Sequence, residues 1–308
     1  MNIVGLDSLV FGVDDIPQCC QYLTDYGLIP YNVDETGGQF KGVDGSSVVI
    51  KARGDASLPL ALPTGSMLRK TIYGVADTHS LEQIKVEMSK DREVLVLDDG
   101  SLEVTDPNGF VLGFQLTVCQ PLTLAAEKIN APGDAQRAVN CIGSIIEPTI
   151  IPRSLSHVVY FVPDQALTEA FYLRLGFVTV DRFNNLGPFM RPAGTLEHHC
   201  LFFIETPPHM LGIEHFTFHV GGPTELMQIG RQFVQKGYES FWGPGRHIFG
   251  SNWFWYFNSP LGAHVEYDAD MDLHDENWTP RACDATEDSS QLFNFTLVDN
   301  WQPGGGPH

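Results

Sequence analysis

Residues 155–176 read L-S-H-V-V-Y-F-V-P-D-Q-A-L-T-E-A-F-Y-L-R-L-G, and residues 6–27 repeat their pattern as L-D-S-L-V-F-G-V-D-D-I-P-Q-C-C-Q-Y-L-T-D-Y-G. Each stretch has an apolar run of strand character, an Asp, and an amphipathic segment that ends in a glycine, Gly27 or Gly176. A glycine at that place is typical of a helix C-terminus, where it tolerates a left-handed backbone. The repeat predicts a strand followed by a helix at the start of each half.

A finer period lies within each half. A strand, a helix and several further strands recur from near residues 5, 68, 155 and 212, and the last unit has a helical pattern over 223–238. D-P-N-G-F-V-L-G-F at 106–114 matches S-P-L-G-A-H-V-E-Y at 259–267, and the shared Pro-x-Gly is turn chemistry between two strands. These matches predict an α+β fold of four βαβββ units in two pairs.

The length of 308 residues predicts two domains. We expect a first domain at 1–118, a linker at 119–153, a second domain at 154–272 and an acidic C-terminal tail at 273–308, whose last residues we expect to be mobile.

Composition excludes several function classes. The formal charge of −20 disfavours nucleic acid, because an acidic surface repels phosphates. No run approaches the ~18 apolar residues of a membrane span, and no signal-peptide pattern begins the chain. Six cysteines without a C-x-x-C pair predict reduced thiols and a cytoplasmic protein.

Chemistry-bearing residues stand in three strand-like stretches of the second half. His157 lies in 155–162, His215 in 213–220 and Glu266 in 263–267. Two imidazoles and one carboxylate are the ligand set of a non-haem Fe(II) oxygenase. Strand alternation alone leaves His219 and His264 as rival ligands, since they share a face with His215 and Glu266 respectively.

The first half serves as an internal control for this interpretation. Its matching positions hold Ser8, Lys70 and Gly113, which do not make a comparable ligand set. The sequence therefore predicts that one half binds metal and the other supports it.

The stretch G-P-G-R-H-I-F-G-S-N-W-F-W-Y-F-N-S-P-L-G-A-H-V-E-Y at 243–267 resembles type I extradiol ring-cleaving dioxygenases of the vicinal oxygen chelate superfamily. That family has G-x-G-R-H, an aromatic run ending in Tyr, then P-x-G and a ligand Glu. The resemblance extends over 155–270 and is weaker over 1–118. It implies two domains of paired βαβββ modules, each an incomplete barrel, and His157, His215 and Glu266 as metal ligands.

By the same resemblance, the chain would use Fe(II), or Mn(II), to insert both atoms of O2 into a catecholic or trihydroxybenzene-type ring. His199 would be the acid/base, His247 would lie near the substrate hydroxyl and the distal oxygen, and Tyr256 would hydrogen-bond the substrate hydroxylate. A histidine suits proton transfer because its pKa of ~6.5 lets it take and return a proton at neutral pH. Relatives commonly form homo-oligomers.

Four further residues are candidates for substrate contact. Val159 matches a small apolar position beside the oxygen site, and Arg191 or Arg246 could meet a polar or anionic ring substituent. Phe254 shares a strand face with Tyr256. The family's polar residue two positions past His247 is replaced by Phe249.

Two alternatives remain open at this point. One is a glyoxalase-like isomerase with another divalent metal. The other is a drug-binding protein without catalysis on the same scaffold.

Overall fold

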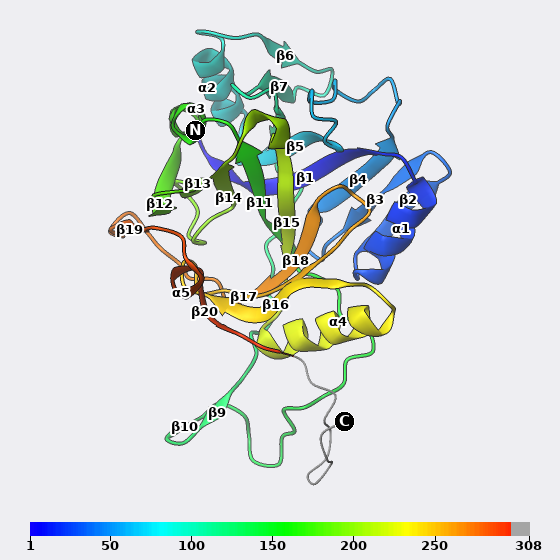
Figure 1. Cartoon of the computed structure of the whole chain (residues 1–308), viewed down its shortest axis with the longest axis vertical. Coiled ribbons are helices and arrows are strands. Elements are labelled where there is room, and N and C mark those ends of the chain that lie inside the picture. Colours follow the sequence, from blue (N-terminus) through cyan, green and yellow to red (C-terminus); the bar gives the residue numbers. More distant parts are fainter. Residues whose placement is uncertain (297–308) are drawn as a thin grey trace.

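The computed structural model describes residues 1–296 and contains two large β-sheets that lie against each other (Figure 1). The first sheet has the strand order β2-β3-β4-β1-β5-β8-β7-β6. Its strands and the two helices between them are β1 (Ile3–Val13), α1 (Ile16–Asp25), β2 (Ile29–Asp34), β3 (Gly37–Lys41), β4 (Ser47–Ala52), β5 (Leu68–Val75), α2 (Thr78–Met88), β6 (Val94–Val96), β7 (Leu102–Thr105) and β8 (Val111–Leu116).

The second sheet repeats this order as β12-β13-β14-β11-β15-β18-β17-β16, with β19 and β20 added at its two edges. Its elements are β11 (Ser154–Val162), α3 (Gln165–Arg174), β12 (Phe177–Phe183), β13 (Gly187–Pro192), β14 (Leu201–Glu205), the short helix η1 (Pro208–Met210), β15 (Gly212–His219), α4 (Pro223–Gln235), β16 (Ser240–His247), β17 (Trp253–Phe257), β18 (His264–Ala269), β19 (Arg281–Cys283), α5 (Glu287–Ser290) and β20 (Gln291–Asn294). The prediction of four βαβββ units, in an α+β fold, is confirmed.

The strand register places the predicted ligands of the second half at the same sheet positions as three residues of the first half. In the second sheet His157 pairs with Thr217, and Thr217 pairs with Glu266. In the first sheet Ser8 pairs with Ile72, and Ile72 pairs with Gly113. The remaining ligand position is set by Val159 opposite His215 and by Val10 opposite Lys70. The expected correspondence of Ser8, Lys70 and Gly113 with the metal-binding set is therefore confirmed.

Helix ends follow local sequence in both halves. The side chain of Asp15 accepts a hydrogen bond from the first turn of α1, and that of Asp164 does the same for α3, as expected for N-caps. After the C-terminal ends come Gly27 at φ +107° and Gly176 at φ +85°. A left-handed backbone at these glycines turns the chain back toward the sheet.

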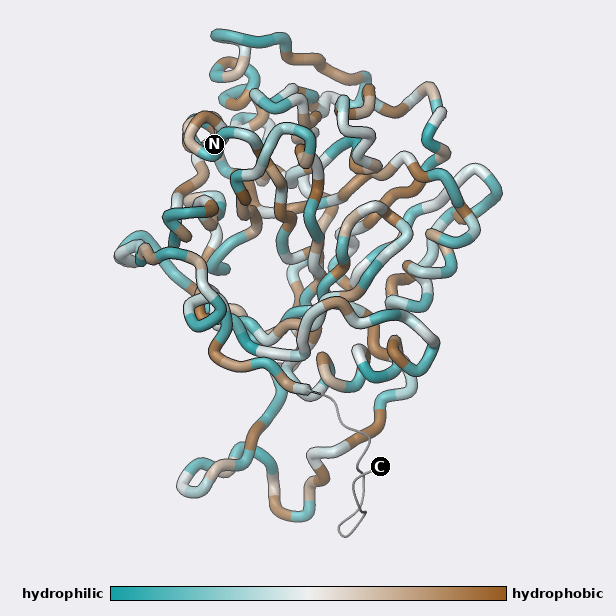
Figure 2. The backbone as a smooth tube through the Cα atoms, in the orientation of Figure 1, coloured by the Kyte–Doolittle hydropathy of each residue, from teal (hydrophilic) through white to brown (hydrophobic). Residues whose placement is uncertain are grey.

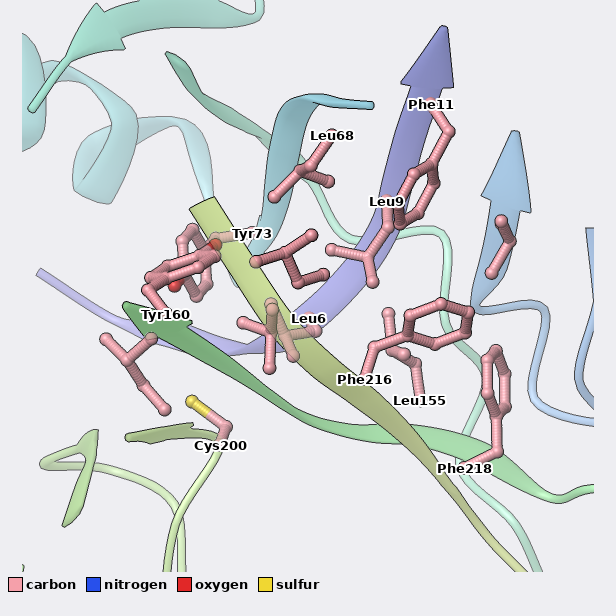
Figure 3. Close-up of a cluster of buried hydrophobic side chains, with 14 of the residues drawn as sticks. Leu6, Leu9, Phe11, Leu68, Tyr73, Leu155, Tyr160, Cys200, Phe216 and Phe218 are labelled. Atoms are coloured by element: carbon pink, nitrogen blue, oxygen red, sulfur yellow. The ribbon is translucent and has the colours of Figure 1, made fainter. Parts of the chain in front are cut away.

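One hydrophobic core fills the space between the sheets (Figure 3). Leu9 and Phe11 of β1 and Phe216 of β15 are fully buried in it, and the rings of Phe11 and Phe216 lie 5.6 Å apart. A polar link joins the halves as well, since the hydroxyl of Tyr26, after α1, donates to the backbone carbonyl of Glu266 at 2.5 Å. The first half therefore packs directly behind the strands that carry the predicted ligands.

The segment that connects β8 to β11 in sequence contains one short hairpin, β9 (Asn130–Ala131) with β10 (Asp134–Ala135). This hairpin projects away from both sheets (Figure 1). Figure 2 shows apolar stretches along this segment. Val139 and Ile146, which belong to it, are exposed. The division into domains and linker stays a prediction.

Residues 281–294 of the predicted tail contribute two strands to the second sheet. The expected mobility of the last residues falls outside the described range. Within residues 1–296, no helix is long and apolar enough to cross a membrane.

Candidate metal centre

Three donor atoms converge where β11, β15 and β18 lie side by side. His157 Nε2 is 3.0 Å from Glu266 Oε2, His215 Nε2 is 3.5 Å from the same oxygen, and the two nitrogens are 3.3 Å apart. Donors that occupy one face of an octahedron, at about 2.1 Å from an ion, are about 3 Å apart. The residues thus form a two-histidine, one-carboxylate metal site.

Each histidine is held by the ring nitrogen that points away from this centre. Ser156 Oγ lies 3.1 Å from Asp268, to which its hydroxyl donates, and 2.9 Å from His157 Nδ1, from which it accepts. Nδ1 of His215 donates to Glu214. A protonated Nδ1 leaves Nε2 with a free lone pair, which is the state that a metal requires.

The surroundings of the Glu266 carboxylate suit a bound cation better than a side chain that only packs in the core. Its side chain is fully buried, and its Oε1 has no hydrogen-bond partner within residues 1–296. Burial would raise its pKa, but the neighbouring His157 and His215 hold the pKa of Glu266 well below its usual value. A buried carboxylate oxygen without a donor is costly, and a divalent cation would remove that cost.

The rival histidines have other partners. His219 Nδ1 lies 2.6 Å from Asp268, and His264 Nδ1 donates to Glu214 at 2.8 Å. Neither belongs to the group of donors at the centre. The geometry therefore favours His215 and Glu266 over these two rivals as ligands.

A cavity of ≈ 290 Å³ opens directly onto the ligands His157 and His215. Its walls are mostly apolar and aromatic. Its lining comprises His157, Val159, Phe161, Phe183, Leu186, Phe189, His199, Phe202, Ile204, Glu214, His215, Phe241, Trp242, His247, Phe249, Asn252, Tyr256, Ala285 and Ser290. Such a combination is typical of a small-molecule site.

All three residues expected to act on the substrate line this cavity. The ring of His199 lies 4.4 Å from that of His157, and burial lowers the pKa of His199 well below its usual value. His247 Nδ1 donates to the Ser290 carbonyl at 3.2 Å, which leaves its Nε2 3.3 Å from the Tyr256 hydroxyl. Chiefly because it is buried, Tyr256 has a pKa well above 10 and keeps its proton.

Of the four candidates for substrate contact, Val159 lines the cavity, and Phe254, Arg191 and Arg246 are not among its lining residues within residues 1–296. Phe254 stacks on His247 at 4.0 Å from behind. Arg191 donates to backbone carbonyls, among them that of Asp275 at 3.1 Å. Arg246 pairs with Asp270 at 2.8 Å.

Several residues of the site were not predicted from the sequence. Glu214 precedes a ligand in sequence, a position from which a carboxylate can hold an imidazole, and this was an available signal. The Thr217 hydroxyl donates to Glu266 Oε2 at 2.5 Å, and Thr217 lies two residues past His215 on the same strand face. Asn252 is buried on the cavity wall with both amide atoms unpartnered among residues 1–296, and no local pattern announces it.

The Glyoxalase/Bleomycin resistance protein/Dioxygenase superfamily has a family model that matches residues 154–267, the segment that holds all three ligands. This segment belongs to that superfamily. The predicted superfamily is therefore confirmed for the metal-binding half.

Metapyrocatechase 2 of Cupriavidus necator is 30% identical to this chain over 178 residues, 57% of this chain and 54% of that protein. The chain thus spans about half the length of this curated superfamily relative.

Two solved structures resemble nearly the whole chain. The Mn(II)-bound glyoxalase from Novosphingobium aromaticivorans has 18% identity and a TM-score of 0.72, over 95% of this chain and 91% of that one. Homoprotocatechuate 2,3-dioxygenase from Brevibacterium fuscum, in complex with 3,4-dihydroxyphenylacetate, has 14% identity and a TM-score of 0.71, over 94% and 88%. At these identities the likeness shows the fold alone, which agrees with the predicted fold.

Proposed function

We propose that this protein is an extradiol dioxygenase that opens a catechol-type ring beside its two hydroxyls with both atoms of O2. The observation that carries the proposal is the convergence of the metal ligands with His199, His247 and Tyr256 at one end of an apolar cavity. An isomerase or a binding protein on this scaffold needs the cavity but not this trio. The metapyrocatechase relative supports the same activity.

We propose Fe(II) as the working metal, with Mn(II) as the alternative, held by His157, His215 and Glu266. Bound there, the metal would lower the pKa of a catechol hydroxyl and carry electron density from the ring to O2. Ligand types alone do not distinguish Fe(II) from Mn(II), so the experiment below compares protein loaded with each metal.

The side chains supply orientation and proton transfer. The Tyr256 hydroxyl, which burial keeps protonated, donates a hydrogen bond to the substrate's ionised oxygen. His247 Nε2 accepts from that hydroxyl or from substrate, because its Nδ1 is occupied by Ser290. His199 is neutral in its buried position, and its Nε2 takes a proton from the second hydroxyl and returns it when the O–O bond breaks.

The cavity also selects the ring substituent. Phe183, Phe202 and Phe249 belong with Val159 to a second cluster of buried apolar side chains, and all four line the cavity. No lysine or arginine lines the cavity within residues 1–296. A carboxylate placed there would be desolvated without a partner, so we propose substrates with uncharged, apolar substituents.

The test uses protein loaded without oxygen with either Fe(II) or Mn(II) and given a panel of catechols. On admission of air, alkyl- or aryl-substituted catechols should consume one O2 per ring and give a yellow ring-cleavage product, while 3,4-dihydroxyphenylacetate should be poor. His199→Ala should retain its metal and lose most of its turnover, leaving a measurable residual rate. Metal binding without O2 uptake across the panel would refute the proposal and favour an isomerase or a non-catalytic binding protein.

The remaining expectations concern the setting of the reaction. We propose a cytoplasmic protein that assembles as a homo-oligomer, as such dioxygenases commonly do. Sedimentation equilibrium would give the oligomeric state.

A further inference from the structure

A chain of buried polar groups runs from His199 away from the cavity. His199 Nδ1 lies 2.9 Å from His198 Nδ1, and His198 Nε2 lies 2.8 Å from Asp181 Oδ2. Asp181 and His198 are fully buried, and His199 is 4% exposed. Arg281 of β19 closes the chain by donating its backbone N–H to Asp181 Oδ1 at 2.7 Å and its guanidinium to Oδ2.

The charge of Asp181 fixes the direction of the hydrogen bonds that link His199, His198 and Asp181. Burial opposes ionisation, but hydrogen bonds from His198 and Arg281 lower the pKa of Asp181 to about 2, so it is a carboxylate that only accepts. His198 must therefore donate from Nε2. Burial lowers the pKa of His198, although Asp181 acts against this, and a neutral His198 accepts at Nδ1.

It follows that His199 donates from Nδ1 to His198. Its second nitrogen, Nε2, then has no hydrogen and offers a lone pair. Because His199 lines the cavity, that lone pair is available to a substrate hydroxyl. The ring is also fixed from its side by Phe189, whose ring meets it nearly edge-on at 5.0 Å.

We propose that His198 and Asp181 are positioning residues that fix the Nδ1–H tautomer and the ring orientation of His199, so that Nε2 can accept the substrate's proton. In that step the O–H bond breaks, its electron pair stays on the substrate oxygen, and the proton bonds to Nε2. The role corresponds to that of the aspartate behind the histidine of a serine protease, with one imidazole inserted between carboxylate and base.

The catalytic part of this inference rests on the proposed function, and a double-mutant cycle tests it. His198→Phe keeps a ring but removes the acceptor, and should lower kcat by about 10- to 100-fold with less than about twofold change in KM and metal content. In a His199→Ala background the same change should have no further effect, because His198 acts through His199. An equal loss in both backgrounds would overturn the proposal.

Two further variants separate positioning from general damage to the fold. His198→Gln offers a carbonyl oxygen in the same direction and should recover part of the activity. His274→Phe is the matched control, since its ring also lies against His198, at 5.5 Å, and it is not among the cavity's lining residues. It should keep the wild-type kcat, and a loss equal to that of His198→Phe would contradict the proposal.

The tautomer can be read without any turnover. In ¹⁵N-histidine-labelled, zinc-loaded protein, the His199 signal, assigned from the spectrum of His199→Ala, should show a protonated Nδ1 and an unprotonated Nε2. The opposite tautomer would refute the inference even if the enzyme opens catechols. If no catechol is opened, the proposed function fails, while the spectrum still decides whether Asp181 and His198 set the tautomer.

Discussion

Glu214→Gln should weaken metal binding without touching a metal ligand. Glu214 Oε2 accepts from His215 Nδ1, and its Oε1 accepts from His264 Nδ1 at 2.8 Å. Burial opposes ionisation, but His215 and His264 together lower the pKa of Glu214 to about 2, so both oxygens are acceptors at neutral pH. A glutamine keeps the shape but has only one such oxygen.

The structure gives the size of the effect. With glutamine, one of the two imidazole N–H groups faces an amide N–H. If His215 then adopts its other tautomer, its Nε2 carries the proton and has no lone pair with which to bind the metal. Changes to groups that orient metal-bound histidines cost about 10- to 100-fold in affinity, which is roughly 1.4–2.7 kcal/mol. We expect a loss in that range for both Mn(II) and Fe(II).

The assay is competition with a chromogenic chelator under anaerobic conditions. His264→Phe is the matched control, because it removes the other partner of the same carboxylate and leaves the pair of Glu214 and His215 intact. It should bind metal within about twofold of wild type. If Glu214→Gln also binds within twofold, the carboxylate does not hold His215 in its ligand tautomer and the reasoning fails.

Two other predictions concern stability. Asn252→Leu should raise the free energy of unfolding of the ligand-free protein by about 1–3 kcal/mol, because both atoms of a buried amide lack partners among residues 1–296. The same change should lower kcat/KM. A thermal midpoint below that of the wild type would contradict the stability prediction. Burial opposes protonation of His219, but Asp268 and Glu197 raise its pKa well above 6.5. Its contribution is therefore complete below about pH 6.5 and lost as pH rises through the higher folded value. Urea titrations should show that loss in wild type but not in His219→Gln.

Repetition made the framework of this chain readable from sequence. The strand starts near 5, 68, 155 and 212 and the glycines that end two helices follow local rules, and the structure has them. The helix expected over 223–238 begins at Pro223 and ends at Gln235, because periodicity locates a helix better than it locates the helix end.

Contacts between distant segments were not readable. Asp181 reaches His198 across 17 residues, and Arg281 reaches Asp181 across 100. No periodicity links such positions, because the contacts depend on how β12, β19 and the turn before β14 come together. Arg191 shows the opposite failure, since an arginine near a site looks available until its carbonyl partners are known.

The shared register explains why, among residues 1–296, a metal site forms in the second half and not in the first. In the first half Lys70 stands at the position of His215, and its ammonium pairs with Glu103 of β7. Gly113, at the position of Glu266, has no carboxylate to offer, and a Cβ added there would meet Ile72 at 3.2 Å. In the first half the charge of Lys70 is thus paired, and the surroundings of Gly113 are too tight for a ligand side chain. This half instead supports the other half. It does so through Tyr26, whose hydroxyl holds the backbone of Glu266 at the metal site.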